Sequence, residues 1–197
     1  MARPQAADYD DRREAILRKA AQMYASAGFL GTSIADLAAA CDTSKALIYH
    51  YFSSKDEILY EIMDSHISAL LHIVDNIESR SNDRPEQQLE ELTRRFVELY
   101  VDASAYHKVL ASDLDKLSIE RRSLIITGER TLIATVETMV RTLSPVLDAK
   151  PGQVRAATML YFGMINWMHT WFRADGPLDS QDVVNLVMQI FLQGLPK

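Results

Sequence analysis

The sequence predicts an all-α protein, and three observations support that fold class. Apolar residues make up 48% of the 197 residues and charged residues 24%, which is ordinary for a globular protein. Only 7 glycines and 6 prolines are available to interrupt helices. Apolar side chains recur at helical spacing along the chain, and no two strand-like segments flank a tight hairpin turn. We expect about nine helices.

Three helices are expected in the first sixty residues. Residues 11–27 present one apolar stripe that ends before a glycine. A second helix begins after Thr32 and Ser33, either of which can cap it, and the third covers only residues 44–52. Two short helices joined by a tight turn form the helix-turn-helix arrangement, whose second helix enters the major groove of DNA.

Longer helices are expected in the rest of the chain. Ser54, followed three residues later by Glu57, is a capping-box pattern that opens a fourth helix. The expected helices cover residues 53–78, 86–104, 106–114, 119–143, 153–172 and 181–192, separated by proline- and glycine-containing breaks. We divide the chain into a helix-turn-helix domain at residues 1–56 and a second all-α domain at residues 57–197.

The N-terminus and the cysteine content predict a cytoplasmic protein. Residues 1–11 are polar and contain no apolar signal segment, and the single cysteine, Cys41, has no partner for an intramolecular disulfide. No window approaches the roughly 18 uninterrupted apolar residues of a spanning helix. We therefore expect no membrane partner.

The charge balance argues against a protein that coats nucleic acid indiscriminately. The net charge is −6, whereas affinity of that kind comes from many Lys and Arg side chains that neutralise phosphates. Even residues 1–60 hold slightly more acidic than basic side chains. A role in DNA binding must therefore rest on where particular residues lie.

The third helix separates its residues into two faces. Leu47, Ile48 and Tyr51 fall on one side, and the opposite side carries Lys45, Ala46, Tyr49 and His50. A lysine can bind a phosphate or a guanine edge, the two rings offer stacking faces and hydrogen bonds, and the small alanine can touch a thymine methyl group. The alternative is that this aromatic cluster merely closes a small helical core.

The order of the motifs resembles the N-terminal signature of the TetR family of bacterial repressors over roughly residues 13–59. The matching string is Gly28-Phe29-x-x-Thr32-Ser33-Ile34-x-x-Leu37-Ala38, then Ser44-Lys45-x-x-Ile48-Tyr49-His50-Tyr51-Phe52, then Ser54-Lys55-x-x-Ile58-Leu59. The resemblance implies that Thr32, Ser33 and Lys55 hold phosphates, that Thr43, Ser44, Lys45, Ala46, Tyr49 and His50 enter the groove, and that Tyr49 and Tyr51 contact the backbone. A cation at a helix N-terminus suits an anion, which supports the role of Lys55 independently.

Three positions depart from the family pattern. Asp42 stands in the turn where Gly is usual, and Asp is one of the few other residues that tolerate the left-handed conformation. Ala46 and Leu47 stand where Gly and Thr are common, so a phosphate contact from position 47 is in doubt.

The resemblance implies that residues 57–197 dimerise and bind a small effector. One stripe of the expected helix at residues 153–172 holds Leu160, Gly163, Met164, Trp167 and Trp171. Phe162, Asn166, Trp167 and His169 are candidates for lining an effector pocket, because Met and aromatic side chains give adaptable apolar surfaces. The alternative is that these aromatic residues belong to the core or to the dimer interface.

Two segments, residues 113–130 and 171–178, resemble TetR-type regulators of fatty-acid, phenylacetate and steroid degradation, whose effectors are acyl-CoA thioesters. Such an effector needs an apolar slot and cations for its phosphates. Arg121, Arg122, Arg130 and Arg173 are the candidate cations, with solvated helix faces and intrahelical pairs as the alternative for each.

No sequence motif indicates an enzyme, a cofactor or a metal site. The chain has no glycine-rich phosphate loop, no His-Glu-x-x-His pattern and no nucleophile elbow. His66 and His72 are six residues apart and fall on opposite sides of one helix, and Cys41 lies on a packing stripe. We expect neither catalysis nor a bound metal.

These patterns predict a homodimeric repressor that binds a palindromic operator and is released by an effector. We expect the two last helices to form the interface, with Leu160, Gly163, Met164 and Trp167 on one and Val183, Leu186, Val187, Ile190 and Phe191 on the other. The fourth helix would connect the DNA to the effector. The alternative is an architectural helical dimer that binds DNA constitutively, although about 137 residues exceed what dimerisation alone requires.

Overall fold

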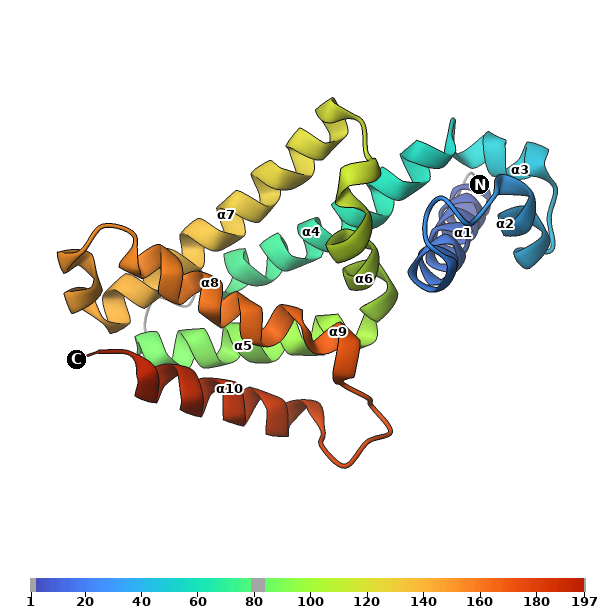
Figure 1. The fold of residues 1–197 in the computed structure, drawn as a ribbon. Helices are drawn as coiled ribbons and strands as arrows, with labels where there is room; N and C mark the ends of the chain where they lie inside the picture. Colours follow the sequence, from blue (N-terminus) through green and yellow to red (C-terminus); the bar gives the residue numbers. More distant parts are fainter. Residues whose placement is uncertain (1–2, 79–83, 197) are drawn as a thin grey trace. The chain divides into compact units, whose positions relative to one another are not determined.

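A computed structural model describes residues 3–78 and 84–196 (Figure 1). The helices are α1 (Arg3–Ala27), α2 (Ile34–Ala40), α3 (Lys45–Tyr51), α4 (Lys55–Glu78), α5 (Pro85–Asp102), α6 (Ser104–Asp113), α7 (Ile119–Leu143), α8 (Gln153–Asn166), α9 (Met168–Trp171) and α10 (Ser180–Gly194), with 3-10 helices η1 (Leu114–Lys116) and η2 (Pro145–Ala149). The described residues contain no strand. The predicted all-α class, with an N-terminal helix-turn-helix, is confirmed.

The chain folds into two compact units, which are described separately. Unit 1 comprises residues 1–66 and 105–125, and unit 2 comprises residues 67–104 and 126–197. Helices α4 and α7 each continue from one unit into the other. The boundary expected after residue 56 falls at the second residue of α4.

The core of unit 1 joins α1 to the helix-turn-helix. Leu37 of α2 and Ile48 of α3 are completely buried, together with Ile58 and Leu59 at the start of α4. Helix α1 begins at Arg3, earlier than predicted, and ends before Gly28. Gly28 has a φ of 79°, and its N–H donates to the carbonyl of Tyr24 at 2.9 Å, so this glycine ends the helix as predicted.

Residues 105–125 complete unit 1. Helix α6 meets α4 at the middle of α4, where Nε2 of His66 lies 3.2 Å from Nδ1 of His107 and both rings are buried. Burial, and the neighbouring His107, lower the pKa of His66 to about 3, so the ring is neutral at physiological pH. At the start of α7, Arg121 pairs with Asp56 and lies 5.4 Å above the Tyr60 ring. These contacts tie a segment far along the sequence to the N-terminal half of α4.

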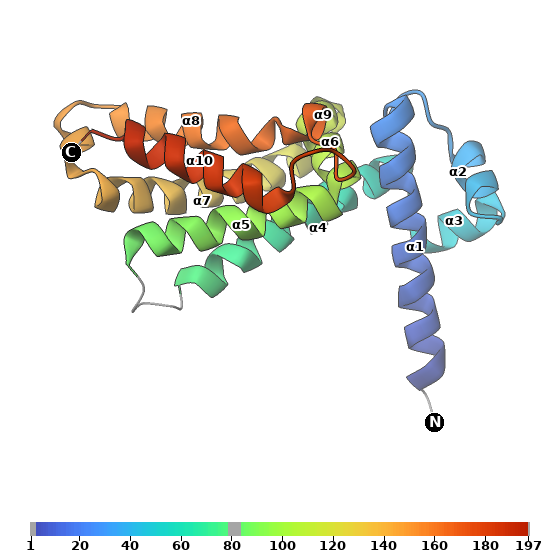
Figure 2. The same cartoon turned by 90° about the horizontal axis from the view of Figure 1, so that it is seen from below.

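The core of unit 2 lies among α5, α8 and α10, which run side by side in both views (Figures 1 and 2). Helix α5 presents a strongly amphipathic sequence and buries Phe96 and Val97 completely. The Tyr161 hydroxyl lies 2.9 Å from Oγ1 of Thr93 inside this core. The hydrogen bond satisfies two buried polar groups that join α5 to α8.

The helix predicted at residues 153–172 is interrupted at Trp167. Side chains just after the break form hydrogen bonds to backbone carbonyls that would accept backbone N–H groups in a continuous helix. Nδ1 of His169 lies 2.8 Å from the carbonyl oxygen of Asn166, and the Thr170 hydroxyl donates to the carbonyl of Trp167 at 2.8 Å. Such local side-chain bonds compete with the helical pattern, so α8 ends and the four-residue α9 begins.

Within unit 2, α7 approaches α4 closely at Gly128. A Cβ atom there would lie 2.4 Å from Cγ2 of Ile67. We expect Gly128→Ala to lower the free energy of unfolding by about 1 to 3 kcal/mol through overpacking, although alanine favours helix by about 1 kcal/mol. Urea unfolding measures the change. In an Ile67→Ala background, which removes the clashing atom, the same substitution should be neutral or stabilising, and an equal loss in both backgrounds would contradict the packing argument.

Candidate DNA-binding surface and effector region

Side-chain caps fix the start of both helices of the helix-turn-helix. The Ser33 hydroxyl accepts from the Asp36 backbone N–H at 3.1 Å, and the Asp36 carboxylate accepts from the Ser33 backbone N–H at 2.9 Å, which completes a capping box. Hydrogen bonds from Ser33 lower the pKa of Asp36. The Ser44 hydroxyl accepts from the Leu47 backbone N–H at 3.1 Å and caps α3.

Asp42 makes the turn between α2 and α3. Its φ is 48°, and it is the only residue other than glycine with a positive φ among those the structure describes. The expected left-handed conformation is therefore confirmed. Because the turn reverses the chain within a few residues, α2 and α3 pack directly against each other.

Helix α3 has a packing face and an open face. Ile48 is completely buried and Leu47 and Tyr51 are half-buried, whereas the Tyr49 side chain is 53% exposed. Lys45, Ala46 and His50 are also exposed. The predicted separation is present, and the open face offers a cation, two rings and a small side chain to a partner.

The three residues expected to hold phosphates form hydrogen bonds within unit 1 instead. The buried Thr32 hydroxyl donates to the Gly28 carbonyl at 3.1 Å. The Ser33 hydroxyl donates to the Asp36 carboxylate at 2.6 Å. The Lys55 ammonium group donates to the carbonyl of Phe29. The first two contacts are local, whereas the Lys55 contact joins residues 26 positions apart and depends on tertiary packing that the motif string did not reveal.

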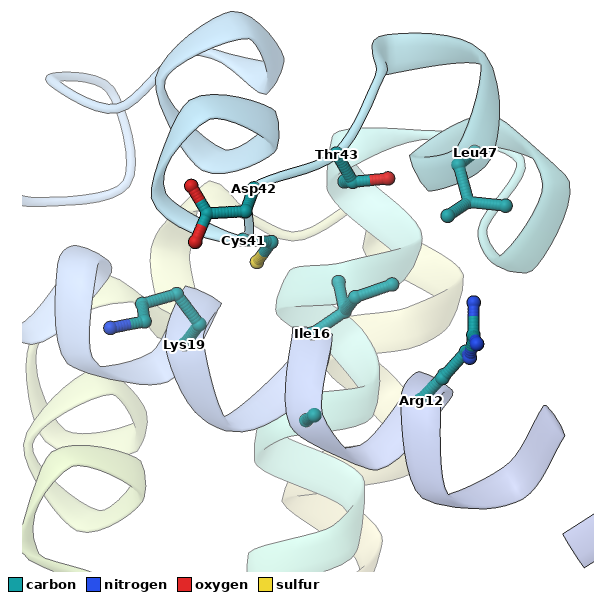
Figure 3. Close-up of a pocket in the computed structure, with 8 residues that line it drawn as sticks. Arg12, Ile16, Lys19, Cys41, Asp42, Thr43 and Leu47 are labelled. Carbon is teal, nitrogen blue, oxygen red and sulfur yellow. The ribbon is translucent and has the colours of Figure 1, made fainter. Parts of the chain in front are cut away.

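A groove of about 360 Å³ lies between α1 and the turn before α3 (Figure 3). Arg12 lies beneath Leu47 and Lys19 beneath Asp42, with Ile16 between them on α1 (Figure 3). Sequence reasoning did not identify this groove, although the spacing of seven between the two cations places them on one helix face. Burial raises the pKa of the half-buried Cys41 thiol in its wall, so the thiol is protonated at neutral pH.

The expected effector residues separate into different environments within unit 2. Phe162 is buried and stacks on Phe96 with ring centroids 6.4 Å apart. Asn166 accepts a hydrogen bond from the Tyr100 hydroxyl at 2.9 Å. His169 lines a cavity of about 190 Å³ together with Tyr100, whereas the Trp167 side chain is 64% exposed.

The four candidate cations are distributed over both units. Arg121 and Arg122 belong to unit 1, and Arg130 and Arg173 belong to unit 2. Arg121 is paired with Asp56, and both Nε and Nη2 of Arg173 bind Asp175 at 3.2 Å. Arg122 and Arg130 are exposed on α7.

Two residues near the expected effector site were not identified from the sequence. Tyr100 on α5 is 5% exposed and joins Asn166. Glu129 on α7 lies close enough to Tyr100 to influence its titration electrostatically. Burial raises the pKa of Glu129. Neither residue belongs to a recognisable motif. They lie on different helices and come near each other only because those helices pack together.

An apolar groove of about 470 Å³ follows α8 and α10 on the outside of unit 2. Leu160 is 70% exposed and Ile190 is 61% exposed at this groove. Val183, Val187 and Phe191, which the sequence placed in the same interface, are instead buried within unit 2. The exposed apolar surface of α8 and α10 is therefore narrower than the dimer interface that the sequence predicted.

Residues 3–78 and 84–196 offer neither a cluster of metal ligands nor a membrane-spanning helix. These residues contain no group of three or more His, Cys, Asp or Glu side chains arranged to hold a metal ion. None of their helices is both long and apolar enough to cross a membrane.

Comparison with known proteins places both halves of the chain in one family. The model of the tetR family of bacterial regulatory proteins matches residues 16–62, and that of the tetracyclin repressor-like C-terminal domain matches residues 82–195. The crystal structure of a TetR-family transcriptional regulator from Bordetella parapertussis 12822 is 36% identical with a TM-score of 0.88, over 92% of this chain and 94% of that one.

Two other similar proteins have names that describe their function. The transcriptional repressor KstR2 of Mycobacterium tuberculosis is 24% identical, over 98% of this chain and 96% of its own length. The structure of AibR in complex with isovaleryl coenzyme A and operator DNA shares the fold, with a TM-score of 0.79 and 23% identity over 91% of this chain and 97% of that one. Both domain models match this chain, and the similar structures cover nearly all of it. The chain belongs to the TetR family of helix-turn-helix DNA-binding transcriptional regulators.

Proposed function

We propose that the protein is a dimeric repressor that an acyl-CoA thioester releases from a palindromic operator. The observation that carries the DNA-binding part is the two-faced α3, which buries Ile48 and exposes Lys45, Tyr49 and His50. A helix capped at its N-terminus and packed along one side presents its other side rigidly, as a reader of the major groove requires.

We assign different roles to the residues on the open face of α3. Lys45 and His50 would read base edges, Ala46 would approach a thymine methyl group, and Tyr49 would contact the backbone beside the groove. The remaining proposed contacts come from Thr43, Ser44 and Tyr51 at the two ends of the helix. Ser33 and Thr32 would approach phosphates through the backbone at the start of α2, because their hydroxyls are already bonded.

Lys45→Ala should change sequence preference because it removes a side chain that reads a base. We expect a loss of about 1 to 3 kcal/mol in discrimination at one base pair. Competition binding against every single-base variant of a selected duplex measures it. Lys150→Ala, at an exposed lysine of unit 2, is the control and should leave the preference unchanged. A uniform loss on all variants would contradict a role in base reading.

Two recognition helices must act together, because one short helix reads only a few base pairs. A symmetric dimer presents two copies about 34 to 36 Å apart on a twofold-related site. The exposed apolar groove along α8 and α10 is the surface that a second copy would cover, since both Leu160 and Ile190 lie open there. Burying such side chains stabilises an interface by about 1.5 to 3 kcal/mol each.

Ile190→Glu should convert the dimer into monomers, because it places a charge in an apolar interface. Analytical ultracentrifugation measures the change, and operator binding should be lost with it. Gln189→Glu introduces the same charge at the exposed neighbouring position and should leave the dimer intact. If the Ile190 variant remained dimeric, the interface would lie elsewhere.

The proposed effector class is supported by similarity and by the residues of unit 2. AibR, which has the same fold, is described with isovaleryl coenzyme A. In this chain Tyr100, Asn166 and His169 lie together and would meet the acyl end of a ligand beside the apolar Phe162. Trp167 would extend this surface. Within unit 2 the exposed Arg130 is the proposed partner of the phosphates, while Arg173 would have to leave its carboxylate.

An effector that releases DNA must bind more weakly when operator is present. We expect the two affinities to differ by the same factor as operator release, about 5- to 150-fold. Titrations of isovaleryl coenzyme A and longer acyl-CoAs, with and without operator, measure this factor. Equal affinities in both titrations would exclude release. The absence of binding by every thioester would exclude this effector class and favour the alternative of a constitutive DNA-binding dimer.

A further inference from the structure

The Lys55 side chain at the start of α4 is directed into unit 1. Its ammonium nitrogen donates to the carbonyl of Phe29 and lies 4.1 Å above the centre of the Phe29 ring. The same nitrogen lies 5.8 Å from the centre of the Tyr24 ring. A lysine bound both to a carbonyl and to an aromatic face gains a charge-assisted hydrogen bond and a cation–π attraction.

Asp113 at the end of α6 also interacts with Phe29, through its backbone N–H. Its side chain is buried, with only 9% of the residue exposed. Burial raises the pKa of Asp113, and a hydrogen-bonding interaction with the Phe29 backbone N–H, together with nearby Lys116 and Lys55, opposes that rise. The carboxylate therefore lies where it stabilises both the Phe29 amide and the Lys55 cation.

Phe29 lies in the turn that leads from α1 into the helix-turn-helix. Its carbonyl also accepts from the Thr32 backbone N–H at 3.4 Å, and its ring meets the Tyr24 ring edge-on at 5.4 Å. The turn covers residues 29–31 and ends three residues before α2 begins at Ile34. Contacts that hold Phe29 therefore help to position the segment that leads into the capped start of α2.

We propose that Lys55 is a positioning residue that holds this turn through the carbonyl and ring of Phe29, with Asp113 holding the same residue from α6, and that Lys55 is not a phosphate ligand. The inference rests on the proposed DNA-binding surface but not on any effector. It departs from the role that the family resemblance implied, and it gives residues 105–125 a direct influence on operator binding.

The salt dependence of binding separates the two roles. A lysine that neutralises one phosphate contributes about 0.9 to the slope of log K against log salt concentration. We expect Lys55→Met to weaken binding roughly tenfold, the loss expected for a charged hydrogen bond, with the wild-type slope retained. Lys45→Met, at the exposed residue proposed to read a base, is the matched control and should change the preference at one base pair, which Lys55→Met should leave unchanged. The DNA is a duplex selected from a random library by the full-length protein.

Variants of Asp113 test the second half of the proposal. Asp113→Ala should weaken binding and accelerate hydrogen exchange at the Phe29 amide, whereas Asp113→Asn retains an acceptor and should restore both. Combined with Lys55→Met, Asp113→Ala should add little further loss, because both changes release the same residue. Thermal melting of each variant confirms that it is folded.

Either of two results would overturn the proposal. One is a slope reduced by about 0.9 in Lys55→Met, which would make Lys55 a phosphate ligand. The other is fully additive losses in the double variant, with unchanged exchange at Phe29. The salt slope and the hydrogen exchange are both measured without acyl-CoA, so a failure of the effector proposal would not affect them.

Discussion

The packing of residues 105–125 against the first half of α4 is the constraint on which the DNA-binding unit depends. The contacts that hold this segment differ in strength. The ion pair between Arg121 and Asp56 is partly exposed, and such pairs contribute about 1 kcal/mol or less. The buried side chains of Val109, Leu117 and Ile125 provide the larger hydrophobic contribution. The polar contacts therefore fix the register of a segment that apolar burial stabilises.

This arrangement gives unit 2 two covalent connections to the DNA-binding unit besides α4. Residue 105 follows directly from unit 2, and residue 126 returns to it along the continuous α7. A ligand that binds unit 2 can bias these connections only through a difference in affinity between two conformations. Because its pKa is lowered to about 3, the buried His66 stays neutral near physiological pH, so protonation of this ring does not disturb its contact with His107.

The outer face of unit 2 illustrates how one amphipathic pattern can serve two surfaces. Helix α10 buries Val183, Val184, Val187, Met188 and Phe191 toward α5 and α8. Leu186 and Ile190 remain 48% and 61% exposed on its other side. Periodicity marks all of these positions as apolar, but only the packed structure shows which of them are buried within unit 2 and which remain exposed.

The sequence by itself determined the all-α class, the helix-turn-helix and the two faces of α3. Those features depend on local signals, such as the Ser33 and Ser44 caps and the left-handed Asp42 turn, which involve residues at most a few positions apart. The tertiary structure alone decided the partner of Lys55, the meeting of Tyr100 with Asn166 and the placement of residues 105–125. These contacts join residues 26 and 66 positions apart in the first two cases. No helical period encodes them, because they arise only when separate helices pack together.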